Sequence, residues 1–159
     1  MATVTKPLDI KGFSHVCTRV SDMGRGLAFY RDLLGLDVIF DVELSGAPLE
    51  AVTGEAGARG RMVGGLLGGT CLELLEIASN SPPPARPKGP ALGYTNISLA
   101  VEHLDAAHEH LANVGGEPGP TTEIGGVRMF FVADPDGTPI EIIEYPNGAT
   151  TSAQLWRGA

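Results

Sequence analysis

The sequence predicts an α+β protein in which two βαβββ modules pair into one domain with a shared cup-shaped mixed sheet. Three observations lead to this prediction. Strand-like and helix-like segments follow one another as β-α-β-β-β and then recur in that order. A proline-rich stretch separates the two sets, and short motifs align between them. The predicted organisation is a first module at 11–78, a linker at 79–91, a second module at 92–146 and a tail at 147–159.

Hydrophobic alternation and helical spacing predict the elements of the first module. Ser21 and Asp22 offer an N-cap to the helical run GRGLAFYRDLLG, and Gly35 is suited to end it. The segment at 45–60 is rich in Gly and Ala and has little periodicity, so we expect a long loop with a helical turn at PLEAV. The expected strands are 13–20, 37–43, 61–67 and 70–77, the last two joined by a turn at Gly68-Gly69.

The second module repeats the pattern in fewer residues. A strand is expected at 94–101, a helix at 103–114 closed by Gly115-Gly116, and two strands at 127–133 and 138–144 around the turn DPDG. A further strand between 117 and 125 is weakly indicated.

Composition excludes several classes of function. The net charge of −8 argues against nucleic-acid binding, which needs a basic surface. No apolar run approaches the length of a membrane span, and the N-terminus lacks the apolar core of a signal peptide. Cys17 and Cys71 lie in strand-like runs and do not form a disulfide-dense frame. We therefore expect a cytoplasmic protein whose partner is a small molecule.

Aligning the two halves places polar side chains at equivalent positions. FSHVCTRV matches YTNISLAV, which sets His15 opposite Asn96, and GGTCLELLE matches DGTPIEIIE, which sets Glu73 opposite Glu141. Because side chains alternate along a strand, these four residues share the sheet face that is not covered by a helix. Two carboxylates and a histidine at repeated positions indicate a divalent cation, one of Mg, Mn, Fe, Co, Ni or Zn.

The same segments resemble a known family. HVCTRVSDMGRGLAFYRDLLGLDV is similar to the opening strand-helix-strand of vicinal-oxygen-chelate proteins, and GGTCLELLE and FFVADPDGTPIEIIEYP resemble their module-closing strands. The resemblance covers roughly residues 11–146 and implies that His15, Glu73 and Glu141 are metal ligands. Asn96 stands where the glyoxalase, methylmalonyl-CoA epimerase and dioxygenase types usually have His. This departure argues against dioxygenase chemistry, and the resemblance also implies a homodimer.

The leading hypothesis is a metal-assisted isomerase, epimerase or lyase that acts next to a carbonyl. A carboxylate, from Glu141, Glu73 or Glu55, would move the proton. Two alternatives use the same cup without metal: a ligand-sequestering protein of the drug-resistance type, and an acid–base enzyme. Other expected substrate contacts are Arg19, Asn96, Cys17, Ser98 and Arg128.

Overall fold

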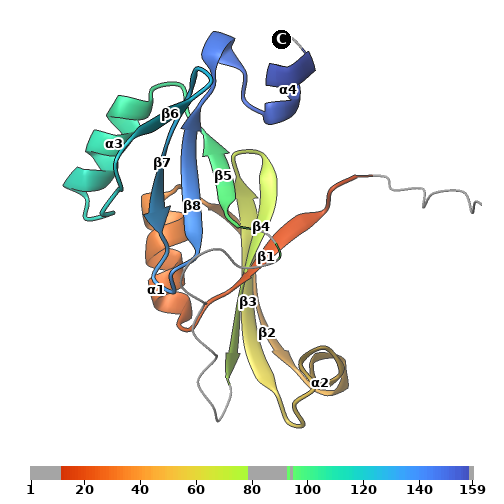
Figure 1. The fold of residues 1–159 in the computed structure, drawn as a ribbon. Coiled ribbons are helices and arrows are strands. Elements are labelled where there is room, and N and C mark those ends of the chain that lie inside the picture. The colour runs from red at the N-terminus through yellow and green to blue at the C-terminus, as the bar shows by residue number, and fades with distance from the viewer. Residues whose placement is uncertain (1–11, 79–92, 94, 158–159) are drawn as a thin grey trace, which may run out of the picture.

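The computed structural model describes residues 12–78, 93 and 95–157, and the predicted linker at 79–91 lies outside the described residues. Within the described part, the α+β fold with two βαβββ modules is confirmed. The strands of these described residues form two four-stranded mixed sheets, one in each module. Figure 1 shows the two sheets one above the other along the molecule.

The first module contains the long sheet. Its elements are β1 (His15–Arg19), α1 (Met23–Leu27) continued by η1 (Ala28–Leu33), β2 (Asp37–Ser45), α2 (Ala47–Thr53), β3 (Arg59–Leu67) and β4 (Thr70–Ala78). Asp22 caps α1 as expected, because its carboxylate accepts from the backbone N–H of Arg25 at 2.7 Å. Gly35, with φ of 82°, follows η1. The segment expected to be mainly loop carries α2, of which only the PLEAV turn was expected.

The second module is shorter. Its elements are β5 (Ile97–Ala100), α3 (Leu104–Asn113), β6 (Thr122–Ile124), β7 (Val127–Ala133) and β8 (Pro139–Glu144), followed by η2 (Pro146–Gly148) and α4 (Ser152–Arg157). The weakly indicated strand is present as β6. No helix of the described residues is long and apolar enough to cross a membrane.

The strand registers are equivalent in the two modules. The strand order is β1-β4-β3-β2 in the first sheet and β5-β8-β7-β6 in the second, and the first two strands of each order are parallel. Cys17 pairs with Glu73, and Ser98 pairs with Glu141. Cys17 lies two residues after His15, and Ser98 lies two residues after Asn96. The equivalent pairing therefore confirms the sequence alignment that sets His15 opposite Asn96 and Glu73 opposite Glu141.

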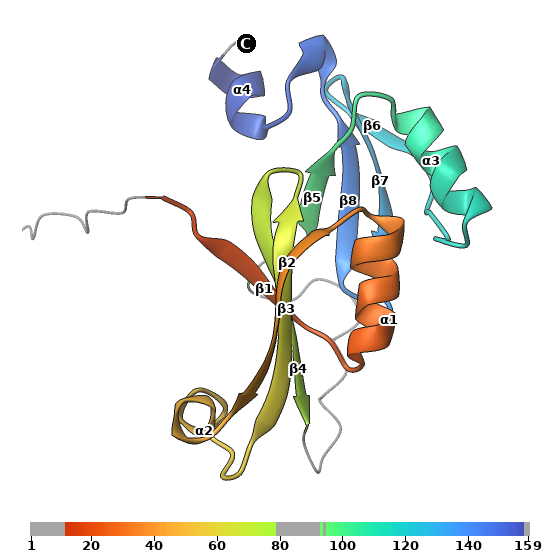
Figure 2. The same cartoon turned by 180° about the vertical axis from the view of Figure 1, so that it is seen from behind.

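One hydrophobic core joins the modules. Figures 1 and 2 show α1 and α3 on the same side of the molecule, which leaves the opposite faces of the sheets uncovered by these helices. Alternate residues of the central strands, such as Leu72 and Leu74 or Ile140 and Ile142, are buried on the helix side in one cluster with Tyr30. Burial of apolar surface on this side therefore fixes which face of each sheet stays open.

Hydrogen bonds connect η1 and the residue Ser21, just before α1, to the DPDG turn at 134–137 in the second module. The buried carboxylate of Asp134 accepts from the Tyr30 hydroxyl at 2.7 Å and from the backbone N–H groups of Asp136 and Thr138 at 2.9 and 2.7 Å. Asp136 in turn accepts from the backbone N–H and the hydroxyl of Ser21. We call this set of contacts the module latch.

Thr18 is a polar residue in the core. It is 2% exposed, and its hydroxyl has no hydrogen-bond partner within the described part of the chain. Replacing Thr18 with Val is expected to stabilise the protein by about 1 kcal/mol, because an unsatisfied buried hydroxyl is removed without much change of shape. Chemical denaturation would measure the change.

Thr53 supplies the matched control for this substitution. Its hydroxyl donates to the Leu49 carbonyl at 2.8 Å, so Thr53→Val should give no such gain. A loss of stability in Thr18→Val would show that the hydroxyl has a partner in solution.

Candidate functional site

The open face of each sheet carries the polar residues singled out from the sequence. Strand pairing sets Cys17 beside Glu73 and Ser98 beside Glu141, so these side chains point to the same side of their sheets. The neighbours Leu74 and Ile142 face the buried side. We call the two open surfaces the cup faces.

His15 and Glu73 form the first polar pair. The His15 Nε2 atom lies 3.4 Å from Glu73 Oε2, and the side chains are 43% and 14% exposed. The Ser14 hydroxyl lies 3.0 Å from His15 Nδ1 and fixes the ring with Nε2 toward the carboxylate. The pair thus offers one imidazole nitrogen and a mostly buried carboxylate at one point of the first cup face.

Asn96 and Glu141 form the second polar pair. The Asn96 Nδ2 atom donates to Glu141 Oε2 at 3.3 Å, and the Thr95 hydroxyl donates to Asn96 Oδ1 at 2.6 Å. Both Asn96 and Glu141 are half-buried. The geometry repeats that of the first pair, with a hydroxyl residue preceding the residue that contacts the carboxylate.

The two pairs do not meet within one chain. Among residues 12–78, 93 and 95–157, no three His, Cys, Asp or Glu side chains come together in a group suited to a metal ion. The fold therefore brings His15 to Glu73 and Asn96 to Glu141, and leaves Glu141 apart from the other two expected ligands.

The surroundings of Glu73 are mainly apolar. Partial burial and, secondly, the charge of Glu73 raise the pKa of the Cys17 thiol, which keeps this thiol protonated at neutral pH. Gly64 pairs with Glu73 in register, and the Phe40 ring lies over it, since a Cβ at Gly64 would come within 2.3 Å of the ring. An aromatic ring thus lies beside the first polar pair.

Arg19 lies on the same cup face as His15. It is exposed, and its guanidinium makes no hydrogen bond or ion pair with another of the described residues. Strand register places it beside Leu75. An exposed guanidinium on this face is suited to bind an anionic group of a ligand.

Two other expected site residues lie away from the polar pairs. Arg128 donates to Asp105 at 2.6 Å and lies 3.6 Å from Glu144, on the side of the sheet that α3 covers. These carboxylates raise the pKa of Arg128, chiefly because the guanidinium donates a hydrogen bond to Asp105. Glu55 is exposed in the turn after α2, and its backbone N–H donates to Thr53.

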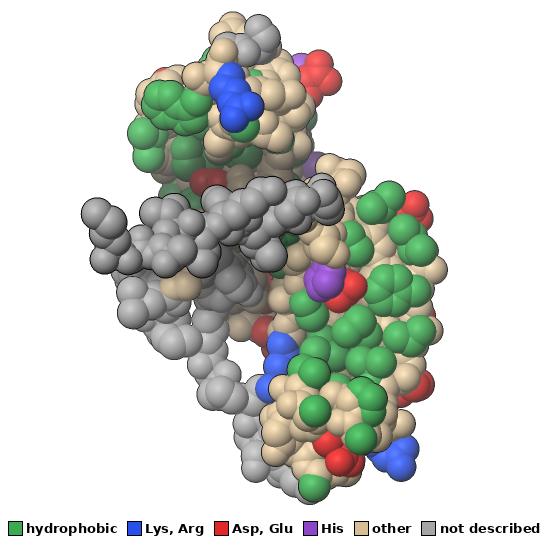
Figure 3. Space-filling model, turned by 90° about the vertical axis from the view of Figure 1, so that its right-hand side faces the viewer, with side chains coloured by type: hydrophobic (Ala, Val, Ile, Leu, Met, Phe, Trp, Pro, Cys, Tyr) green, Lys and Arg blue, Asp and Glu red, His purple; other side chains and the backbone are tan. Residues whose placement is uncertain are grey.

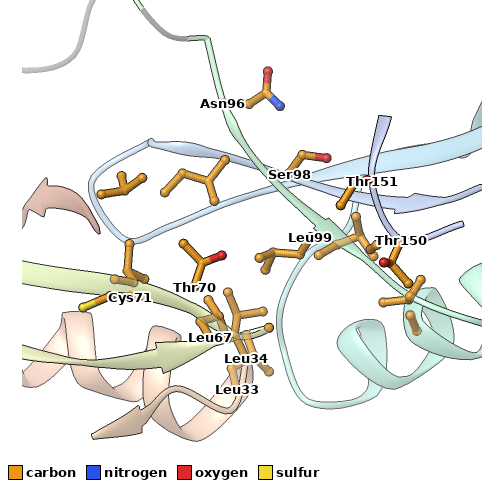
Figure 4. A pocket seen from close by; sticks show the side chains of 18 of the residues that line it. Leu33, Leu34, Leu67, Thr70, Cys71, Asn96, Ser98, Leu99, Thr150 and Thr151 are labelled. Atoms are coloured by element: carbon orange, nitrogen blue, oxygen red, sulfur yellow. The ribbon is translucent and has the colours of Figure 1, made fainter. Parts of the chain in front are cut away.

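A cavity of about 950 Å³ lies between the modules. Its lining is mainly apolar, with Leu33, Leu34 and Leu67 from the first module and Leu99 from the second. Figure 4 shows the hydroxyl side chains of Thr70, Ser98, Thr150 and Thr151 around it. Cys71 and Asn96, which both belong to cup faces, also line it. The cavity has the size and lining of a small-molecule site.

Hydrophobic side chains also gather on the surface of the first module. Figure 3, which views the right-hand side of Figure 1, shows a broad hydrophobic area over this sheet. Val42 and Leu66 on the first cup face are each 42% exposed, and Phe131 on the second is 44% exposed. Contiguous apolar surface of this kind is typical of interaction sites.

Ser14 and Thr95 were not anticipated from the sequence. Each holds the residue that follows it, through His15 Nδ1 in one module and Asn96 Oδ1 in the other. The signal was present, because the alignment of FSHV with YTNI sets one hydroxyl residue opposite the other.

Comparison with known proteins gives a consistent set of relatives. Residues 12–142 match the model of the Glyoxalase/Bleomycin resistance protein/Dioxygenase superfamily. A 2-epi-5-epi-valiolone epimerase from Actinomyces sp is 28% identical over 88% of this chain and 82% of its own. A lactoylglutathione lyase from Salmonella typhimurium is 27% identical over 82% and 90%. The crystal structure of a glyoxalase family protein from Enterococcus faecalis superposes with a TM-score of 0.68 at 28% identity, covering 86% of this chain and all of that one.

Proposed function

Because the chain belongs to the Glyoxalase/Bleomycin resistance protein/Dioxygenase superfamily, we propose that it is an enzyme that moves a proton next to a carbonyl group, as an isomerase, epimerase or lyase. Relatives named epimerase and lactoylglutathione lyase support an activity of this class. The observation that carries the proposal is the repeated polar pair, His15–Glu73 in one module and Asn96–Glu141 in the other.

The donor set is suited to a divalent ion, and one protein of similar fold, the fosfomycin resistance protein FosX from Listeria monocytogenes, has a structure in complex with Mn(II). His15 offers a nitrogen and Glu73 and Glu141 offer carboxylate oxygens, a combination that binds hard and borderline divalent metals. The Ser14 hydroxyl supplies the outer contact that metal-binding histidines usually have. A bound ion would supply Lewis-acid stabilisation to a substrate oxygen that gains negative charge.

A homodimer would complete the site. The two polar pairs lie on separate sheets, so the first cup face of one protomer needs the second cup face of its partner to gather all three expected ligands. The exposed hydrophobic residues Val42, Leu66 and Phe131 on these faces support such a contact. In a two-fold dimer both copies of the shared site form at once.

Side chains of the protein carry out the proton transfer and bind the substrate. Glu73 or Glu141 removes the proton from the carbon next to the carbonyl and becomes a carboxylic acid. In an epimerase the other of these two carboxylates, which starts as the carboxylic acid, gives a proton to that carbon from the opposite side; in an isomerase the first acid returns its proton to a neighbouring atom. Arg19 binds an anionic group of the substrate, and Phe40 shields the reacting carbon from water.

Metal content tests the proposal. Protein purified without chelator and without a metal affinity column is expected to contain about one divalent ion per chain by elemental analysis. Metal-free protein would sink the Lewis-acid arrangement. The same cup faces would then belong to a metal-free acid–base enzyme or to a ligand-sequestering protein. Turnover of a bound ligand would indicate the enzyme, and binding without turnover would indicate the sequestering protein.

A further inference from the structure

Asn96 occupies the position that the repeat gives to His15, but its chemistry is different. Each contacts an equivalent carboxylate, at 3.3 Å from Asn96 and 3.4 Å from His15. Each is also held from behind by the hydroxyl of the preceding residue. The two positions therefore differ only in the group that faces the carboxylate.

The direction of the Asn96 amide follows from its two neighbours. An ionised carboxylate only accepts hydrogen bonds, so the amide –NH₂ group must face Glu141. The Thr95 hydroxyl donates to the amide oxygen at 2.6 Å on the other side. Turning the amide over would set the amide oxygen against a carboxylate oxygen and lose the bond to Glu141, whereas the Thr95 hydroxyl can accept as well as donate and would bond the amide either way.

The two pairs consequently respond differently to a cation. His15 has a tautomer in which Nδ1 donates to the Ser14 hydroxyl and Nε2 carries no proton, so in that tautomer Nε2 can offer a lone pair to a cation beside Glu73. Asn96 and Glu141 already satisfy each other. An amide nitrogen has no lone pair to offer a metal, and the amide oxygen is turned toward Thr95.

We propose that Asn96 is a positioning residue that holds one oxygen of Glu141 and is not a metal ligand. This inference rests on the proposed function for its metal. The ion would be held by three side chains, His15, Glu73 and Glu141, and Glu141 keeps a second oxygen that does not accept from Asn96. A site with three protein ligands leaves more of the ion's coordination sphere to substrate oxygens than a site with four.

Binding of Mn²⁺ alone, followed by titration calorimetry, tests the assignment. Asn96→Ala should keep the stoichiometry and lower the affinity by about 10- to 100-fold, as expected for an outer contact. Glu141→Ala, which removes a ligand, should lower it much further. Asn113→Ala, at the exposed end of α3, is the matched control and should bind as the wild type does. An equal loss in Asn96→Ala and Glu141→Ala would overturn the assignment.

A second measurement needs no metal and keeps the two proposals separable. In the metal-free protein, the Asn96 side-chain amide protons should be shifted and protected from solvent exchange in NMR spectra. Both effects should disappear in Glu141→Ala and persist in Asn113→Ala. If wild-type protein binds no Mn²⁺, the metal-assisted form of the proposed function fails. The NMR result still decides the direction of the Asn96 amide. Unchanged amide signals in Glu141→Ala would overturn the positioning role.

Discussion

Turnover is expected to disappear when Glu141 is replaced with Gln, while the fold stays intact. Gln keeps the size of the side chain and an oxygen that can accept from Asn96, but it neither binds a cation strongly nor takes up a proton. The loss should be roughly 10²- to 10⁴-fold from proton transfer alone, and larger if the ion is lost as well. Incorporation of solvent deuterium next to the carbonyl, screened over small carbonyl compounds by mass spectrometry, would measure it.

Mixed protomers provide a sharper form of this experiment. Glu73→Gln should also abolish turnover, because it removes the carboxylate of the other polar pair. If sites are shared between protomers, a refolded mixture of the two variants contains dimers with one intact site. Half of the dimers are then mixed and each has one of two sites, so about a quarter of wild-type activity should return.

Two outcomes would contradict this scheme. Full activity in Glu141→Gln would remove this carboxylate from the reaction. A mixture that stays inactive, although each variant is folded and dimeric, would show that the two polar pairs do not combine across protomers.

Asp134→Ala is expected to destabilise the protein by about 3 kcal/mol or more. The substitution removes a buried carboxylate that accepts three hydrogen bonds, one from the Tyr30 hydroxyl and two from the backbone N–H groups of Asp136 and Thr138. For a chain of this size the melting temperature should fall by about 6–12 °C. Differential scanning calorimetry would measure the fall.

Two variants calibrate this result. Tyr30→Phe removes one latch contact and should cost about 1–2 kcal/mol. Asp32→Ala, which removes an exposed carboxylate that accepts from its neighbour Arg31, should change stability by less than about 0.5 kcal/mol. A small effect of Asp134→Ala would show that the latch is not needed to hold the modules together.

Much of this fold could be predicted because the modules repeat. Glu73 and Glu141 look like ordinary strand residues when each is taken alone. Once the two halves are aligned, a strand period of two residues is enough to put each on the open side of its sheet, and the pairing of Cys17 with Glu73 and Ser98 with Glu141 agrees. Local helix signals, such as the Asp22 cap, were also reliable.

Other features depend on long-range packing and could not be predicted. Arg128 was expected to face a ligand, but Asp105 on α3 binds it on the covered side of the sheet, a contact that strand alternation alone does not reveal. The separation of the two polar pairs in space depends on how the two modules pack, which local sequence patterns do not reveal. The direction of the Asn96 amide required knowing both of its neighbours in space.

The module latch also sets an order of events during biosynthesis. Its bonds connect residues 104 and 115 positions apart, Tyr30 with Asp134 and Ser21 with Asp136. Contacts of such long sequence separation form late and slow the search for the native state. On the ribosome the first helix emerges well before the DPDG turn, so the latch bonds cannot form until most of the chain has been made, although the helix can already pack against β4 of its own module. The first module therefore depends on nearly the whole chain for its final packing.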